Sequence, residues 1–417
     1  MSMTLPISNP ESRAGNPYAA PRPYAPGARR IKVLLISHTC QSRTEGQPKA
    51  HALAKLPDID LHLLTPQRWM HYGQWREAEP PVGGGGGVGC RFETTIAPVR
   101  FGWVGPAQYF LHYYPSLPRI LRSFRPDVID LWEEPWGLVS ARTCRLRNKL
   151  LPTAKIVSET EQNINKVLPF PFEAFRRYTL QQADYVVGRN RESIDVVRSK
   201  GYKGPAEVVP NAVDMELFRP LDRARCRAEL GIALPADAFL AGYAGRLVEE
   251  KGLMDVLESL PAAPPRVHAL LLGSGPQEES LRARAKELQV EGRTHFLPAR
   301  PREQLPAFMN ALDVFVLPSR TTARWKEQFG RVIIEAHACG TPVIGSDSGA
   351  IPDVIADAGL VVPEKNPPAL GAALAKLASD GALAGQLGSR GRENAGSNFT
   401  WDRVAERMAC IYQNVMR

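Results

Sequence analysis

The segment DVFVLPSRTTARWKEQFGRVIIEAHACGTPVIGSD, residues 313–347, decides the fold of this chain. Its two ends, DVFVLPS and TPVIGSD, are short apolar runs of the kind that form buried parallel strands. The middle part, GRVIIEAHACG, has apolar residues at helical spacing, which predicts a helix that begins near Gly330 and ends at Gly340. A strand, a helix and a strand in this order form a βαβ unit, and such units build a parallel sheet.

Similar apolar runs lie on both sides of this unit and form two series. The first is IKVLLIS, IDLHLLT, PDVIDLW, AKIVSE and ADYVVG, and the second, after Pro210, is AFLAGYAG, VHALLLG, THFLP, DVFVLPS, TPVIGSD and GLVVP. Helices fit between the runs, for example the amphipathic ESLRARAKELQ. A chain of 417 residues also exceeds one ordinary core. We therefore expect an α/β protein of two Rossmann-like, doubly wound domains that face each other across a cleft.

The expected organisation has four parts. Residues 1–30 repeat proline and small polar residues without the apolar stretch of a signal peptide, which indicates a disordered tail. The two domains are expected at residues 31–205 and 206–395, followed at residues 396–417 by a C-terminal helix that crosses back to the first domain. The glycine run at residues 83–87 lacks the lysine and the spacing of a phosphate-binding loop, so it indicates a flexible loop.

The composition is typical of a soluble globular protein, with 44% hydrophobic and 23% charged residues. A formal charge of +9 suits anionic partners such as nucleotides, nucleic acid or an acidic membrane surface, although a basic charge can also serve solubility alone. The six cysteines are scattered without a CxxC pair, so neither a zinc site nor a disulfide framework is indicated, and a reducing cytoplasm fits best. No apolar run reaches the roughly 18 residues of a membrane span.

Five motifs in sequence order resemble those of the retaining glycosyltransferases of family 4, which have the GT-B fold. They are PNAVDMELFRP, AGRLVEEKG, LLGSGP, DVFVLPS and the pair Glu327 and Glu335, which seven residues separate. The likeness runs from about residue 31 to the C-terminus and is strongest in residues 210–355. It implies that the first domain binds the acceptor and that the second binds the nucleotide sugar.

Two basic residues are expected to bind the donor diphosphate, which becomes a better leaving group when positive charge stabilises it. Arg246 and Lys251 follow AFLAGYAG at the carboxyl end of an expected strand, where doubly wound sheets bind ligands. Solvated surface charges are the alternative, but the flanking Gly245 and Gly252 and the resemblance favour a diphosphate site. Because these side chains supply cations and no Asp/His cluster is evident, we expect neither a metal nor another cofactor.

The two glutamates are not spaced as an acid/base pair. On one continuous helix their carboxylates would lie about 80° apart, and Glu327 is expected in the loop before the helix. The resemblance implies that Glu327 joins Arg246 and Lys251 in the catalytic site and contacts the donor sugar, while Glu335 bonds the nucleotide ribose. A helix-terminal charge for Glu327 and a solvated face for Glu335 are the structural alternatives.

Backbone groups are expected to complete the donor site. The N–H groups at the helix start would face the diphosphate, and glycine permits a close approach of LLGSGP to the donor. The donor-binding residues expected in this way are Gly245, Ser274, Gly275, Phe329, Gly330 and Arg331.

The acceptor side departs from the family pattern. Many relatives carry a histidine after a strand of the first domain, but VIDLWEEPWGL, residues 128–138, has Trp132, Glu133 and Glu134 there. We expect Glu133 or Glu134 to orient the acceptor, with helix-capping charge as the alternative. Further candidates at the carboxyl ends of expected strands are His38, Glu161 and Asn163, for which a structural histidine and a polar loop are the alternatives.

An aromatic and basic stretch, FGWVGPAQYFLHYYPSLPRILRSFRP, occupies residues 101–126. Leu117, Ile120, Leu121 and Phe124 have helical spacing, so core packing explains part of it. The other aromatic and arginine residues suit a sugar-stacking surface or a membrane-facing edge for a lipid-linked acceptor. Our hypothesis is peripheral membrane contact through the first domain.

The function expected from these features is retaining transfer of a hexose from a UDP- or GDP-sugar to a hydroxyl of a saccharide or lipid-linked saccharide. This would serve cell-surface polysaccharide or glycolipid synthesis, in the cytoplasm or at the inner face of the cell membrane. A sugar-nucleotide epimerase, a phosphorylase and a non-catalytic nucleotide-sugar-binding protein are the alternatives. Nucleic-acid binding is not expected, because the arginines are dispersed and no recognised module is present.

Overall fold

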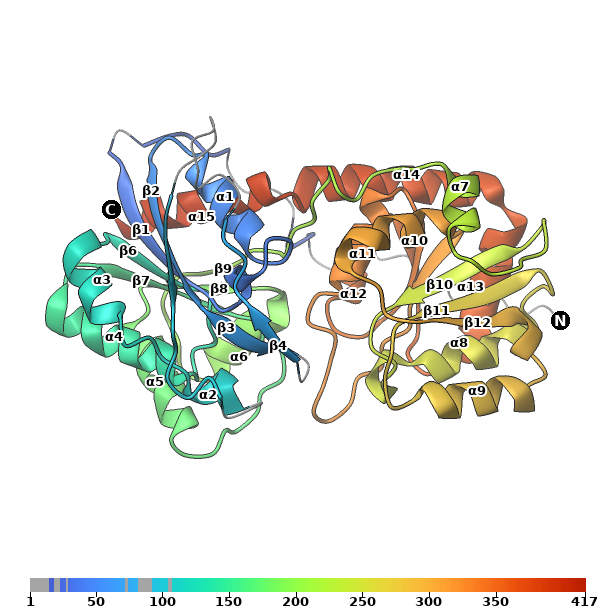
Figure 1. Cartoon of the computed structure of the whole chain (residues 1–417), viewed down its shortest axis with the longest axis horizontal. Helices are drawn as coiled ribbons and strands as arrows, with labels where there is room; N and C mark the ends of the chain where they lie inside the picture. Colours follow the sequence, from blue (N-terminus) through green and yellow to red (C-terminus); the bar gives the residue numbers. More distant parts are fainter. Residues whose placement is uncertain (1–14, 19–22, 28, 72–73, 82–91, 104–106) are drawn as a thin grey trace. The chain divides into compact units, whose positions relative to one another are not determined.

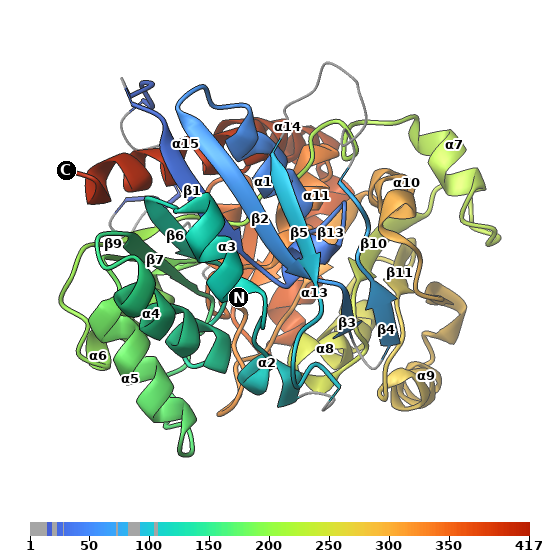
Figure 2. The same ribbon diagram turned by 60° about the vertical axis from the view of Figure 1, so that its left-hand side comes forward.

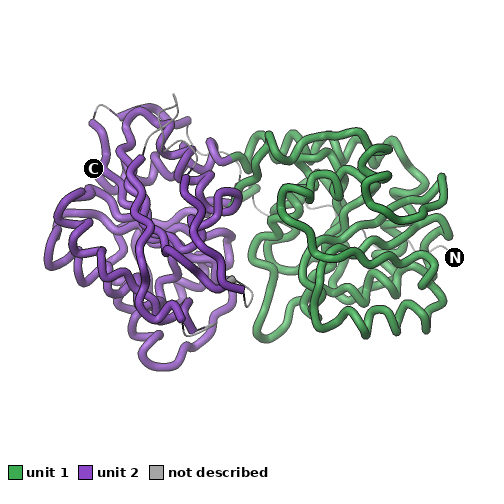
Figure 3. Tube along the Cα trace, in the orientation of Figure 1, with its two compact units in different colours: residues 1–19, 211–400 green, residues 20–210, 401–417 purple. Residues whose placement is uncertain are grey.

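The chain forms two compact units in a computed structural model that describes residues 15–18, 23–27, 29–71, 74–81, 92–103 and 107–417 (Figure 1). Unit 1 comprises residues 1–19 and 211–400, and unit 2 comprises residues 20–210 and 401–417 (Figure 3). The boundary follows Pro210, later than the expected 205/206, because the strand at residues 206–208 pairs with the sheet of unit 2.

Unit 2 is built on a parallel sheet of seven strands. In spatial order these are β5 (Glu93–Ala97), β2 (Ile59–Pro66), β1 (Ile31–Ile36), β6 (Val128–Leu131), β7 (Lys155–Thr160), β8 (Tyr185–Gly188) and β9 (Ala206–Val208). Its helices are α1 (Gln47–Ala54), α2 (Gln108–Leu111), α3 (Leu117–Phe124), α4 (Leu138–Leu150), α5 (Phe172–Gln182), α6 (Arg191–Ser199) and α15 (Trp401–Val415). Helices α3, α4 and α5 cover one face of the sheet, and α1 and α15 lie on the other (Figure 2).

All five strands expected in the first domain are present, and three further elements were not predicted. Strands β5 and β9 lack apolar runs of the expected kind, and an antiparallel hairpin joins β3 (Arg68–His71) to β4 (Gln74–Glu77). The apolar residues Leu117, Ile120, Leu121 and Phe124 of α3 are all buried in the core, as their spacing predicts.

Unit 1 repeats the architecture with six parallel strands, all of them predicted. In spatial order these are β12 (Thr294–Leu297), β11 (Val267–Leu272), β10 (Phe239–Ala244), β13 (Val314–Leu317), β14 (Val343–Ser346) and β15 (Gly359–Val362). Its helices are α7 (Arg223–Ala228), α8 (Leu253–Ser259), α9 (Glu278–Glu287), α10 (Leu305–Ala311), α11 (Arg331–Ala338), α12 (Ile351–Ile355), α13 (Pro367–Ser379) and α14 (Gly381–Asn398). Both units are therefore Rossmann-like and doubly wound, as expected.

Each sheet has one point where the strand order reverses. In unit 2 the chain leaves β1 for β2 on one side and later adds β6 on the other side. In unit 1 the same reversal separates β10 from β13. Successive helices lie on opposite faces at such a point, so a ligand can reach the carboxyl ends of the two strands. These two reversals are where a binding site is expected.

The N-terminal segment is not uniformly disordered, contrary to the expectation. Tyr18 is wholly buried and packs edge-on against Phe329 and Phe399 within unit 1, at 5.5 and 5.3 Å between ring centroids. In unit 2 the Tyr24 hydroxyl and the Gly27 N–H donate to the buried carboxylate of Asp58. Residues 1–14, 19–22 and 28 of the expected tail, and the whole glycine run at 83–87, lie outside the described residues.

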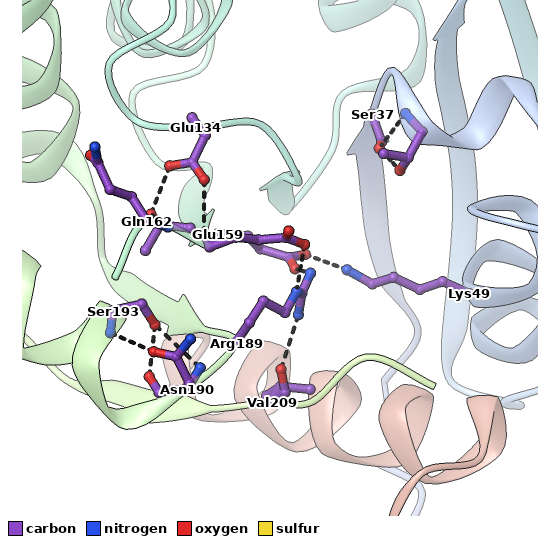
Figure 4. A network of polar contacts seen from close by, with 12 residues as sticks. Ser37, Lys49, Glu134, Glu159, Gln162, Arg189, Asn190, Ser193 and Val209 are labelled. Carbon is purple, nitrogen blue, oxygen red and sulfur yellow. Dashed lines mark hydrogen bonds and ion pairs between the residues drawn. The ribbon is translucent and has the colours of Figure 1, made fainter. Parts of the chain in front are cut away.

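A buried network of charges joins the sheet of unit 2 to α1 and α15. Ile129 and Leu131 of β6 and Ile156 of β7 belong to the α3 core, so the alternation along each strand points Asp130 and Glu159 to the opposite face. Lys49 of α1 and Arg189 both bond Glu159 (Figure 4). Lys49 Nζ also lies 3.1 Å from Asp130 Oδ2. The Tyr412 hydroxyl of α15 donates to Asp130 Oδ2 at 2.6 Å. The C-terminal helix is thus anchored to this sheet.

Candidate active site

A lysine and a glutamate pair at the strand reversal of unit 1. Lys251 Nζ lies 2.6 Å from Glu327 Oε2, and the Ser319 hydroxyl donates to the same oxygen at 2.9 Å. Lys251 also lies over the Trp325 ring, 4.5 Å from its centroid. Glu327 is only 7% exposed, and a buried carboxylate needs partners in the protein because it has lost most of its contact with water. Lys251 and Ser319 are such partners. Ser319 and Trp325 follow β13, whereas Lys251 follows β10, so the pair spans the reversal.

A glycine allows Lys251 to reach this place. Lys251 ends the short 3-10 helix η4 (Glu249–Lys251), and Gly252 after it has a left-handed φ of +67°. A Cβ at Gly252 would lie 2.0 Å from the Pro318 carbonyl oxygen, so only glycine lets η4 lie against the end of β13. The Arg320 guanidinium then binds Asp255 of α8 at 2.9 and 2.5 Å and holds the two segments together.

Arg246 lies on the loop directly after β10. The Tyr243 hydroxyl donates to the Arg246 carbonyl at 2.8 Å, and the Arg246 side chain is 46% exposed, 3.7 Å from Glu250. The Leu247 N–H donates to the Ser274 carbonyl at 2.9 Å, so the loops after β10 and β11 are tied together. A Cβ at Gly275 would lie 2.3 Å from the Leu247 carbonyl oxygen. Two cations and a tightly packed glycine loop therefore meet at one sheet edge, an arrangement suited to binding an anion.

The predicted helix is confirmed as α11, and Glu327 lies in the loop before it. The cap residue Gly330 has φ +78°, and the helix starts at Arg331, whose N–H is among the first four that have no partner inside a helix. The Phe329 ring is buried in the core. Glu335 is 1% exposed rather than on a solvated face, with Arg302 Nη2 2.7 Å and Arg331 Nε 3.8 Å away.

A histidine and a glutamate pair at the strand reversal of unit 2. The backbone N–H of His38, after β1, donates to Glu133 Oε1 at 2.6 Å, and His38 Nδ1 lies 2.7 Å from Glu133 Oε2. Glu133 follows β6 and is 5% exposed. His112 Nε2 lies 3.7 Å from Glu133 Oε1, and the His38 ring stacks on the buried Trp69 at 4.8 Å. Glu133 was expected to orient the acceptor, but its buried carboxylate is bound to His38.

The other expected acceptor residues lie on the neighbouring loop after β7. Glu134 accepts bonds from the Thr160 hydroxyl at 2.7 Å and the Glu161 N–H at 2.8 Å, so it anchors this loop (Figure 4). Asn163 is buried and its amide donates to Glu192 at 3.2 Å. The Glu161 carboxylate, 39% exposed, lies 3.4 Å from Arg189 Nε. Of these three, Glu161 presents the most accessible side chain.

Burial and pairing shift the pKa values of these carboxylates in opposite directions. Burial raises the pKa of Glu134 to about 7, against the hydrogen bonds from Glu161 and Thr160 that favour its charged form. Burial would also raise the pKa of Glu133, but the two histidines outweigh it and hold that pKa at about 2. Glu133 is therefore a carboxylate at neutral pH.

Two sequence profiles cover most of the chain. A profile of the group 1 glycosyl transferases matches residues 231–394, and one of glycosyltransferase family 4 matches residues 49–217. The chain belongs to glycosyltransferase family 4. Its two-unit fold is the GT-B fold, as the motifs predicted.

Curated relatives and solved structures agree with this membership. A D-inositol 3-phosphate glycosyltransferase of Saccharomonospora viridis is 31% identical over 302 residues, which are 69% of this glycosyltransferase and 67% of that protein. One from Streptomyces bingchenggensis is 34% identical over 252 residues, or 56% and 54% of the two chains. This glycosyltransferase spans about half the length of several relatives that it matches, 54% and 47% in two cases.

Solved structures share the fold of this glycosyltransferase at low identity. Sucrose-phosphate synthase from Thermosynechococcus elongatus has a TM-score of 0.68 at 23% identity, over 93% of this chain and 99% of that one. Anabaena HepE in complex with UDP-glucose has a TM-score of 0.60 at 18% identity, over 92% and 100%.

Several residues of these sites were not singled out from the sequence. Ser319 closes the motif DVFVLPS and could have been found there. Arg302, Trp69 and His112 carry no such signal, because each comes from a segment far along the chain from the residue that it contacts. Within the part of the chain that the structure describes, no cluster of three metal-ligating side chains occurs.

Proposed function

We propose that this enzyme transfers a hexose from a UDP- or GDP-sugar to a hydroxyl of a saccharide or lipid-linked saccharide. The observation that carries this is the Lys251–Glu327 pair at the strand reversal of unit 1, with Arg246 on the adjoining loop. The two cations bind the diphosphate, and the Glu327 carboxylate accepts a hydrogen bond from a sugar hydroxyl. The N–H groups at the start of α11 add positive potential, and Glu335 bonds the ribose.

The reaction needs no protein base. The bond from the anomeric carbon to the phosphate oxygen breaks while a bond to the acceptor oxygen forms on the same face of the sugar. The acceptor proton passes to the departing phosphate oxygen. Negative charge builds on the diphosphate in the transition state, where Lys251 and Arg246 stabilise it in place of a metal ion.

The comparisons suggest which substrates to test first. The Anabaena HepE structure contains UDP-glucose, and the curated relatives are named for D-inositol 3-phosphate. We therefore include UDP-glucose among the donors, and inositol phosphate beside saccharides among the acceptors. Product analysis separates the alternatives: an epimerase would convert the donor sugar without releasing nucleotide, a phosphorylase would require phosphate, and a binding protein would form no product.

Donor binding should raise thermal stability by mass action. At a donor concentration of 100 times Kd the expected gain is about 2.7 kcal/mol, a rise of a few degrees in Tm. Titrating UDP-, GDP- and ADP-sugars would identify the base, and UDP- or GDP-sugars should give the rise, with or without EDTA. If none of the three raised Tm and no nucleotide was released from any of them, the donor site would be wrong.

Membrane contact is part of the proposal, through exposed apolar side chains of unit 2. Val167 and Phe170, on the loop before α5, are 84% and 88% exposed, and Trp103, in the aromatic stretch, is 72% exposed. Phe110 of α2 packs against Phe172 at 4.8 Å, which joins the two segments. No helix of the described chain is long and apolar enough to span a bilayer.

The membrane contact predicts co-flotation with vesicles of an anionic phospholipid at low salt. Replacing both Val167 and Phe170 by serine should reduce it about tenfold or more, because about two apolar side chains leave the lipid. Leu221→Ser, at a 40% exposed leucine of unit 1, is the control. Lack of flotation by the unmodified protein would rule out this surface.

A further inference from the structure

The donor site does not use the His38–Glu133 pair, although that pair occupies the matching place in unit 2. His38 is the second residue after β1, and Glu133 is the second residue after β6. These strands are neighbours, with Ile36 opposite Leu131 at their last residues. Because the strand order reverses between β1 and β6, this is the sheet edge where a ligand of unit 2 would bind.

Both oxygens of Glu133 are bound by one residue. Oε1 accepts from the His38 backbone N–H at 2.6 Å, and Oε2 lies 2.7 Å from His38 Nδ1. A carboxylate accepts hydrogen bonds, so Nδ1 carries the hydrogen in this contact. The His38 side chain is 21% exposed, whereas that of Glu133 is 3% exposed. The remaining ring nitrogen, Nε2, has no hydrogen-bond partner among the described residues and is left for a ligand.

Neighbouring rings fix the orientation of the His38 imidazole. Trp69 of β3 stacks on it at 4.8 Å and an angle of 26°, and Tyr109 of α2 contacts it edge-on at 5.4 Å. His112 supports this arrangement, with Nδ1 2.9 Å from the Gln108 carbonyl and its ring 6.2 Å from that of His38. Three side chains thus hold the imidazole in a single orientation, as expected for a group that must contact a ligand in one fixed position.

The surrounding charges keep this imidazole protonated to higher pH than a free histidine. Burial lowers the pKa of His38, but the charge and hydrogen bond of Glu133 outweigh it, helped by Glu161 and Glu134, and the net pKa is raised. Among the residues that the structure describes, His112 and Tyr109 are further titratable side chains that face this ring. Below this raised pKa both ring nitrogens carry a hydrogen, so Nε2 donates to an oxygen.

We propose that His38 binds the acceptor, its Nε2–H donating to a hydroxyl oxygen of a polyhydroxylated ring, and that Glu133 is the positioning residue that holds His38 in place. This assignment rests on the hexosyl transfer proposed above and names the group that meets the acceptor. The assignment also accounts for the missing family histidine. The segment at residues 128–138 lacks that histidine, but it supplies the Glu133 carboxylate, which orients His38.

The test separates acceptor handling from donor chemistry. UDP-glucose is the donor, release of UDP to water measures the donor site alone, and transfer is measured with myo-inositol 3-phosphate, myo-inositol and glucose as probe acceptors. His38→Gln should lower kcat/KM for the acceptor about 10- to 100-fold, the loss expected for a hydrogen bond from a charged donor. Donor KM and UDP release to water should stay within about threefold, since unit 1 is unchanged.

Glu133→Gln tests whether Glu133 acts through the pKa of His38. If Glu133 only stabilised the fold, the pH profile of acceptor kcat/KM would not change in this variant. Removing the carboxylate lowers the pKa of His38, so the limb of the acceptor kcat/KM profile that is lost at alkaline pH should move to lower pH. The matched control is His62→Gln, because His62 also pairs with a glutamate in unit 2, with Nδ1 2.9 Å from Glu93, but lies within β2. It should leave the profile unchanged.

Three results would overturn this assignment. They are unchanged acceptor kinetics in His38→Gln, an equal loss of UDP release to water in that variant, or an unmoved pH limb in Glu133→Gln. If a variant fails to fold, the ¹⁵N chemical shift of His38 Nε2 is measured instead, in the unmodified protein with each probe acceptor. An unchanged chemical shift with every probe acceptor would also contradict the contact. If the unmodified enzyme released no UDP from any donor, the proposed function itself would fail.

Discussion

Replacing Lys251 by alanine is expected to lower kcat about 10²- to 10³-fold, the usual cost of removing one group that stabilises developing negative charge. In the proposed site the substitution removes the ammonium that binds the diphosphate, and Glu327 loses the cation that lies 2.6 Å from it. A carboxylate that is 7% exposed then lies beside the diphosphate with less compensation, which also weakens donor binding. Both effects act in the same direction, so kcat/KM should fall further than kcat.

The measurement is single-turnover transfer from the donor that best raises Tm. Lys286→Ala is the control, because this lysine lies on α9 of the same unit and is exposed. It should retain the rate of the unmodified enzyme. A Lys251→Ala enzyme within threefold of that rate would show that the diphosphate is stabilised elsewhere.

Replacing Lys49 by alanine should destabilise unit 2 by about 3–5 kcal/mol, the cost of leaving a buried charge without its partner. Lys49 Nζ lies 3.1 Å from Asp130, bonds Glu159, and lies 4.6 Å from the centroid of the Trp132 ring. Burial and the charge of Glu159 already raise the pKa of Asp130, whereas Arg189 and Lys49 together overcome burial and lower that of Glu159. Without Lys49, two carboxylates share one remaining cation.

Denaturant unfolding followed by hydrogen exchange in β6 and β7 would locate the loss in unit 2, since two units need not unfold together. Lys55→Ala, at the C-terminal cap of the same helix, is the matched control, because the side chains of its ion pair with Asp402 are 58% and 65% exposed. Such a pair contributes at most about 1 kcal/mol. Equal effects of the two substitutions would mean that the buried network adds nothing to stability.

Local sequence patterns predicted much of the fold. The eleven apolar runs became β1, β2, β6, β7 and β8 in one sheet and β10 to β15 in the other, because a strand buried on both faces must be apolar nearly throughout. Strand β5 was not predicted, because it lies at a sheet edge and all of its residues but the last, in ETTIA, are exposed or partly exposed. It therefore has no apolar run. Helix α11 was predicted within one residue of its start, since glycine marks both its ends.

The two candidate sites were predictable to different degrees. In unit 1 the sequence placed Arg246 and Lys251 at the carboxyl end of a strand and Glu327 in the loop before a helix, but it did not show that Lys251 and Glu327 bond each other. In unit 2 the sequence suggested His38 and Glu133 separately, as alternatives. Their contact joins residues 95 positions apart in the chain, and no local pattern reports such a distance.

By itself, the sequence determined the eleven apolar strands, the helices between them and the membership of family 4, because hydrophobic periodicity and motif spacing act over short distances along the chain. Only the tertiary structure decided which charges are partners: Lys251 with Glu327, Arg302 with Glu335, and His38 with Glu133. The physical reason is burial. A carboxylate removed from water must find a cation or a donor, and the order in which strands join the sheet decides which one is near.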